Sequence, residues 1–193
     1  MWSWNLRENE MKIKQGKILV VGGTGRNLGK TEFICRLLSR FLYSNITVIK
    51  IKTLYHGDEN FHGKGYDMKG DYIIREEFDA GGLEDSRRFL AAGAKSVLYI
   101  RSRAEKLGKA VQEALSRISI NQLIIFESNS IVNVLKPAVY IMLAGPDKDK
   151  YKPSSRKLID QADIIIRSSG SGFETEPEDL KISIENNTWE FKA

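Results

Sequence analysis

Short apolar segments alternate along this chain with segments whose apolar residues recur at helical spacing. The apolar segments are rich in β-branched residues, as is typical of strands buried on both faces, and they are residues 18–21, 46–51, 95–100, 123–126, 138–143 and 164–166. The helical spacing occurs in residues 33–42, 83–92, 107–118 and 153–162. This alternation predicts an α/β fold with a doubly wound, mostly parallel sheet flanked by helices.

Near the C-terminus the pattern changes to strict alternation of apolar and polar residues. Ile182 and Ile184 precede the dipeptide Asn186-Asn187, and Trp189 and Phe191 follow it. Asparagines tolerate the left-handed backbone of a tight turn, so residues 179–193 are predicted to form a β-hairpin appended to the sheet. The 193 residues are expected to form a single domain, 1–193.

Residues 53–82 interrupt the alternation of strands and helices. They hold six glycines, and seven acids against three bases. This composition predicts an irregular loop insertion with a short strand at 72–74, placed to fold over bound phosphates or a second substrate. His56 and His62 lie among these carboxylates, so either a metal site or a solvated loop is compatible with the segment.

The residues after the first strand carry the clearest chemical signal, G-G-T-G-R-N-L-G-K-T at 22–31. Glycines let backbone N–H groups turn toward phosphate oxygens, and the start of the next helix adds the positive end of its dipole. The pattern therefore predicts a phosphate-binding loop, one residue longer than the common spacing. Its predicted nucleotide contacts are Gly23, Thr24, Gly25, Arg26, Asn27, Leu28, Gly29, Lys30, Thr31 and Glu32.

Within this loop, two side chains have specific expected roles. Lys30 is expected to contact the β- and γ-phosphates, and the Thr31 hydroxyl to ligate Mg²⁺. The apolar strand at 123–126 ends on Glu127, a layout in which the carboxylate holds Mg²⁺ directly or through water. Lys30 and Glu127 are the predicted catalytic residues, and Thr31 and Glu127 the predicted metal ligands; the alternative for Glu127 is a chance acid at a strand end.

Several charged residues lie where a second substrate would be expected. Lys50 and Lys52 are near the carboxyl end of the second strand, and Arg101 directly follows the strand predicted at 95–100. Ligands of open α/β sheets bind outside the carboxyl ends of strands. With Asp85 at a predicted helix start, these residues are candidate contacts for a small anionic substrate.

Overall composition limits the kinds of ligand that the chain is expected to bind. The net charge of +5 and pI near 9.2 suit small anionic ligands. Nucleic acid is not expected, because no aromatic-basic cluster accompanies the charge. The single cysteine, Cys35, rules out a disulfide framework and a cysteine-based zinc site. No apolar run approaches the roughly 20 residues of a membrane span, and no signal-peptide layout opens the chain, so a cytoplasmic location is expected.

The loop G-T-x-x-x-L-G-K-T resembles that of the dethiobiotin synthetase group of P-loop proteins. Three further segments resemble the molybdopterin-guanine dinucleotide biosynthesis adaptor family (MobB), and they are residues 48–50, 84–94 and 126–128 within a similarity that runs from about 17 to 167. The resemblance implies a P-loop NTPase fold, GTP binding, an anionic pterin as partner and a homodimer. Ser128, Glu84 and Thr53 depart from the family's glycine, lysine and histidine.

Three functions stay open at this point. The first is a Mg²⁺-dependent, GTP-binding accessory factor of molybdenum cofactor biosynthesis with slow hydrolysis of the triphosphate. The second is an ATP-dependent ligase or kinase of the dethiobiotin synthetase type, acting on a small acid, and the third is a nucleotide-switched scaffold. The guanine-reading motif Asn-Lys-x-Asp is absent, although Asp147 follows a strand where a base reader could lie, so GTP and ATP both remain candidates.

Overall fold

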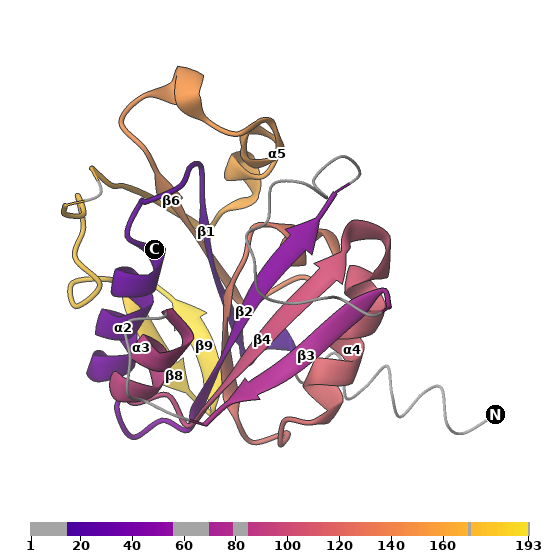
Figure 1. The fold of residues 1–193 in the computed structure, drawn as a ribbon. Coiled ribbons are helices and arrows are strands. Elements are labelled where there is room, and N and C mark those ends of the chain that lie inside the picture. Colours follow the sequence, from indigo (N-terminus) through magenta and orange to yellow (C-terminus); the bar gives the residue numbers. More distant parts are fainter. Residues whose placement is uncertain (1–14, 56–69, 79–84, 170, 193) are drawn as a thin grey trace.

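The structure, a computed structural model, describes residues 15–55, 70–78, 85–169 and 171–192. A seven-stranded sheet in the order β3-β4-β2-β5-β1-β6-β7 forms its centre (Figure 1). The strands of this sheet are β1 (Ile18–Gly23), β2 (Ile46–Leu54), β3 (Tyr72–Glu77), β4 (Ser96–Arg103), β5 (Leu123–Glu127), β6 (Val139–Ala144) and β7 (Ile164–Arg167). All neighbouring pairs are parallel except β3 with β4.

Helices lie on both faces of this sheet. The α-helices are α2 (Lys30–Arg40), α3 (Asp85–Ala91), α4 (Leu107–Ser116) and α5 (Pro153–Arg156). Short 3₁₀ turns are η1 (Ala104–Lys106), η2 (Ser130–Asn133), η3 (Lys148–Lys150) and η4 (Ile159–Gln161). The predicted doubly wound, mostly parallel α/β fold is confirmed, and its architecture is P-loop-like. Among the described residues, no helix has the length and apolar content to cross a bilayer.

The sheet divides the interior into two hydrophobic cores. On one face, which we call the α2 face, Phe33 and Leu37 of α2 and Phe89 of α3 pack against alternate residues of the strands. On the opposite face, which we call the α4 face, Leu107 and Val111 of α4 do the same. Successive residues of a strand point to opposite faces, so membership of a core tells which face each strand residue occupies.

The C-terminal hairpin forms as predicted but joins differently. Strands β8 (Ile182–Glu185) and β9 (Thr188–Phe191) are antiparallel, and Asn186 and Asn187 both have positive φ, as the tight turn requires. The expectation that the hairpin extends the main sheet was wrong, because β8 and β9 make a separate two-stranded sheet. Trp189 is buried in the core of the α2 face, where the hairpin packs beside α2 (Figure 1).

Several predicted boundaries were also wrong. Strand β4 continues to Arg103, so Arg101 lies inside the strand and not after it. Residues 53–54 end β2 and residues 72–77 form β3, an ordered edge strand, so these parts of 53–82 are not an irregular loop. The rest of that segment, with His56 and His62, lies outside the described residues.

Two predicted helices are shorter than their apolar spacing suggested. Helix α2 ends at Arg40, and Leu42, placed on its apolar face by the pattern, is 48% exposed. The helix predicted at 153–162 is broken into α5 and η4. Ser155 ties α5 to the loop by donating to the Thr24 carbonyl, while Leu158 packs into the core of the α4 face, and the chain turns between these two attachments.

Candidate phosphate-binding site

The loop between β1 and α2 has the backbone of an anion-binding turn. Asn27 has φ +56° and Gly29 has φ +74°, so two left-handed residues come just before the right-handed start of α2. The first helical hydrogen bond runs from the Phe33 amide to the Gly29 carbonyl at 2.8 Å. A Cβ on Gly29 would lie 3.1 Å from the Phe173 ring, so glycine is required there both for φ and for space. Backbone of this kind turns successive N–H groups toward one concavity.

The Lys30 side chain folds back over the start of the loop. A Cβ placed on Gly23 would lie 3.2 Å from Lys30 Cδ and 3.4 Å from its Nζ. Gly23 thus leaves the space in which the lysine lies, and the ammonium group is above the end of β1. The Lys30 ammonium and the N-terminus of α2 thus lie at the same end of β1, and both favour phosphate oxygens.

Thr24 and Leu28 anchor the loop to the strand ends beside it. The Gly145 amide donates to Thr24 Oγ1 and the Lys152 amide to the Thr24 carbonyl, both at 2.9 Å. The Ser168 hydroxyl donates to the Leu28 carbonyl at 2.9 Å. Both anchors are buried. The accessible residues of the predicted ten-residue loop are Arg26, Asn27 and Glu32, which are exposed, and Gly25, Gly29 and Lys30, which are half-buried.

An asparagine that sequence reasoning missed clamps the loop from below. The Gly23 amide donates to Asn129 Oδ1 at 2.7 Å, and Asn129 Nδ2 donates to the Gly23 carbonyl at 2.8 Å. Gly22 allows this contact, because a Cβ there would lie 2.6 Å from Asn129 Oδ1. Asn129 lies two residues beyond the predicted strand-end acid, and no local pattern identifies it.

Replacing Asn129 by alanine is expected to lower the free energy of unfolding by about 1–3 kcal/mol, since two hydrogen bonds of about 0.5–1.5 kcal/mol each are lost. Urea unfolding measures the change. Asn121→Ala is the control, because Asn121 is exposed and its described hydrogen bonds use only its backbone amide and carbonyl. Equal stability of the two variants would show that the clamp contributes nothing.

Positive charge concentrates around the loop beyond Lys30. The pKa of Lys152 is lowered, first by its desolvation and then by the charges of Lys30 and Arg26. Lys152 directly precedes α5, and its backbone is bonded to Thr24. No local sequence pattern marks Lys152, although ligands of open α/β sheets bind at the carboxyl ends of strands, a rule that points to the segment after β6. Three cations thus surround the loop, which favours a polyanionic ligand.

The lowered pKa of Lys152 leads to a pH prediction. The charged form is disfavoured in the free protein, so Lys152 lowers stability below its folded pKa, and this penalty fades as pH rises through it. A bound polyphosphate favours the charged form, so binding should take up protons at alkaline pH and weaken as pH rises toward 10.5. Calorimetric titration of tripolyphosphate in two buffers of different ionisation enthalpy measures the uptake. Lys152→Gln should reduce it, and identical uptake by that variant would contradict the assignment.

The predicted acid, Glu127, lies in register beside the loop. It is the Cα partner of Val21 in β1 and of Lys50 in β2. Its side chain is only 8% exposed, and Oε2 lies 3.2 Å from Lys50 Nζ. No described donor makes a well-aligned hydrogen bond to this buried oxygen. The Lys50 ammonium therefore already faces Glu127 Oε2, and this oxygen can still accept hydrogen bonds.

These residues fit the magnesium ion that a phosphate loop implies. Mg²⁺ commonly takes one or two protein oxygens and completes its shell with water and substrate phosphates. Glu127 offers the under-bonded carboxylate oxygen, and Thr31 is buried in the first turn of α2. No group of three His, Cys, Asp or Glu side chains that could hold a metal occurs in the described part of the chain. A metal at this site would therefore depend on phosphate and water ligands.

Three other residues singled out in the sequence, Glu32, Asp85 and Asp147, are not shown to contribute a side chain to the site. The Glu32 carboxylate pairs with Arg88 of α3, so its side chain points toward that helix. Asp85 begins α3, but its side chain lies outside the described residues. Asp147 caps η3, accepting from the Asp149 amide at 3.0 Å, and it pairs with Lys150, contacts that hold its pKa below the usual range. The Asp147 carboxylate is thus already occupied.

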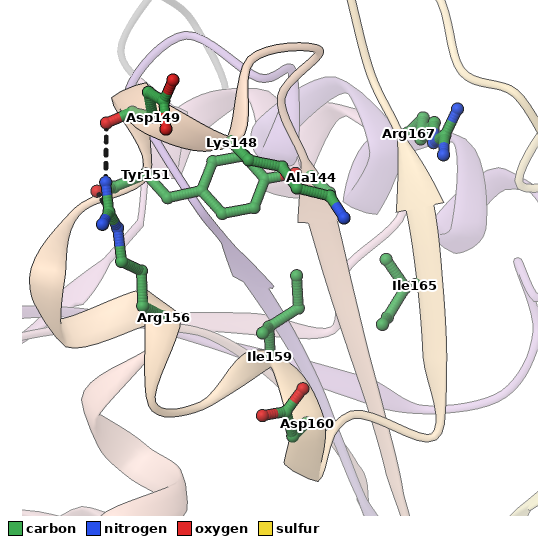
Figure 2. A pocket seen from close by; sticks show the side chains of 9 residues that line it. All are labelled: Ala144, Lys148, Asp149, Tyr151, Arg156, Ile159, Asp160, Ile165 and Arg167. Atoms are coloured by element: carbon green, nitrogen blue, oxygen red, sulfur yellow. Dashed lines mark hydrogen bonds between the residues drawn. The ribbon is translucent and has the colours of Figure 1, made fainter.

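A pocket of about 540 Å³ lies beside the loop but on the α4 face of the sheet (Figure 2). Its floor includes Ile159 and Ile165, and the Tyr151 ring borders it. Arg156 holds the rim by donating to the Asp149 carbonyl at 2.7 Å. Because Ile165 alternates with core residues of the α2 face, the pocket and α2 are separated by the sheet. The loop and Glu127 therefore form a site that does not include this pocket.

Comparison of the chain with protein-family models, with curated proteins and with solved structures found no match.

Proposed function

We propose that the chain is a Mg²⁺-dependent nucleotide-binding protein of the P-loop kind, with slow hydrolysis of a nucleoside triphosphate. The observation that carries the proposal is the position of the Lys30 side chain over Gly23, across a loop in which Asn27 and Gly29 have positive φ. Glu127 and Thr31 lie on the strand and helix that border the same loop. An ordinary glycine turn would need neither the lysine nor the buried acid.

Each residue then has a role that follows from its chemistry. The loop amides and Lys30 bind and orient the β- and γ-phosphates. Thr31 and Glu127 would hold Mg²⁺, which when bound neutralises charge on the phosphates. Asn129 keeps the Gly23 peptide in place and so positions the loop.

The choice between the two enzymatic alternatives depends on the second substrate. The resemblance to the MobB adaptor family supports a GTP-binding accessory factor of molybdenum cofactor biosynthesis. The register pair Lys52 and Arg101 supports instead a ligase or kinase that acts on a small anion with ATP. The Asp147 carboxylate accepts from the Asp149 amide and pairs with Lys150, so it gives no reason to prefer guanine or adenine.

Titration of GTP and ATP with and without Mg²⁺ tests the proposal. Tighter binding with Mg²⁺ is expected, with one nucleotide preferred. Thr31→Val removes the hydroxyl with little change in shape, and Glu127→Gln removes the charge. Hydrolysis should fall more in both variants than binding of the nucleoside diphosphate, because the γ-phosphate is where the metal's charge is most needed. Unchanged Mg²⁺-dependent turnover in both variants would place the metal elsewhere.

A further inference from the structure

A row of cations continues from the phosphate loop across the α2 face of the sheet. In β2, Val48 belongs to the core of this face, so Lys50 and Lys52 share its side of the strand. In β4, Val97 belongs to the same core, and Arg101 shares its side. Lys50, Lys52 and Arg101 are all half-buried, so each keeps some contact with solvent.

Lys52 and Arg101 are direct neighbours. Their Cα atoms are register partners in adjacent parallel strands, which lie about 4.8 Å apart. Burial lowers the pKa of Lys52, and the charges of Arg101 and Arg26 lower it further. Like charges directly opposite each other repel, so an anion bound beside the pair would be stabilised by both charges.

The pair lies on other strands than β1, which leads into the loop. From β1 the order of strands is β5, β2 and β4, so the pair lies two to three strand spacings, roughly 10–14 Å, from the strand that carries the loop. Arg26 of the loop is close enough to Lys52 and to Lys152 to affect the pKa of both. The charge of Arg26 thus acts both on the cations around the loop and on those of β2 and β4.

We propose that Lys52 and Arg101, with Arg26 beside them, bind the phosphate group of a second substrate, a small phosphate monoester. This inference rests on the proposed function, since the nucleotide would fill the neighbouring loop. A phosphate dianion neutralises two charges where a carboxylate neutralises one, and the planar arginine fork matches phosphate oxygens in pairs. The two juxtaposed cations of this pair therefore suit phosphate better than carboxylate.

Residue-resolved NMR of the full chain separates this subsite from the loop. Inorganic phosphate is the probe and sodium acetate the comparison. We expect phosphate to shift the amide signals of residues 50–54 and 99–103. At these amides the phosphate affinity should fall at least tenfold in Lys52→Gln and in Arg101→Gln. Lys109→Gln, an exposed change on α4, is the control and should leave the affinity unchanged.

Each outcome decides one of the two proposals. Absence of phosphate shifts at 50–54 and 99–103, or equal shifts in the variants and the control, would overturn the subsite. Acetate binding there as tightly as phosphate would overturn the phosphate assignment. A failure of the proposed function would appear separately, as a lack of response to Mg²⁺-nucleotide at residues 23–31. If one of the two variants fails to fold, its NMR spectrum will show this. The phosphate affinity of the other variant then decides whether the subsite exists.

Discussion

Replacing Lys30 by alanine is expected to weaken the binding of nucleoside triphosphate roughly ten- to a hundredfold. One charge-assisted contact to the phosphates, of about 1.5–3 kcal/mol, is lost. The Lys30 side chain lies over Gly23, and the three atoms nearest to a Cβ placed there all belong to Lys30. Equilibrium titration with Mg²⁺-GTP and Mg²⁺-ATP measures the change.

The fold is expected to survive this substitution. Lys30 is half-buried at the start of α2, and alanine is a strong helix former there. Thermal unfolding of the variant verifies this, and Lys157→Ala, an exposed change between α5 and η4, serves as the matched control. A folded Lys30→Ala protein with unchanged nucleotide affinity would overturn the phosphate-loop interpretation.

The second large effect is expected at the ion pair beside the loop. Lys50→Met should lower the free energy of unfolding by about 3 kcal/mol when no metal is present, because the Glu127 carboxylate is then left buried without its cation. This figure is the lower end of the usual range, since Lys50 is 23% exposed. Addition of Mg²⁺ with nucleotide should restore most of the stability, because the metal supplies the missing charge. Urea unfolding in EDTA and in Mg²⁺-nucleotide measures both.

A double variant separates the pair from its surroundings. In Lys50→Met with Glu127→Gln, no charge is left unpaired, so its stability in EDTA should exceed that of Lys50→Met alone. Mg²⁺ with nucleotide should not raise the stability of the double variant more than that of the parent, because the carboxylate that would hold the metal is gone. A Lys50→Met protein as stable as the parent in EDTA would contradict the account of the pair.

The features that sequence predicted correctly are those determined by neighbours along the chain. The apolar strands and the glycine loop depend on local residue types, and the turn at Asn186 and Asn187 depends on the backbone preference of asparagine. The place of Glu127 at the end of β5 also follows from a local signal, an acid directly after an apolar run, while its role as a metal ligand stays a prediction. These predictions needed no knowledge of which strands pair.

The features that were missed depend on strand order and register. Lys50 faces Glu127 because β2 and β5 are adjacent with these residues in register. Asn129 and Lys152 reach the loop from segments 106 and 128 residues away from Gly23 and Thr24. Strand β4 extends through Arg101 because β2 and β3 pair with it on both sides, which apolar content alone did not indicate.

Hydrogen–deuterium exchange with and without Mg²⁺-nucleotide shows whether the loop binds phosphate, because loop amides that donate to phosphate exchange more slowly. Mg²⁺ with GTP or ATP is expected to slow exchange at residues 24–31, and Lys30→Ala is expected to remove most of this protection. Protection confined to residues 144–167 around the pocket on the α4 face, or no protection at 24–31 at saturating nucleotide, would contradict phosphate binding by the loop.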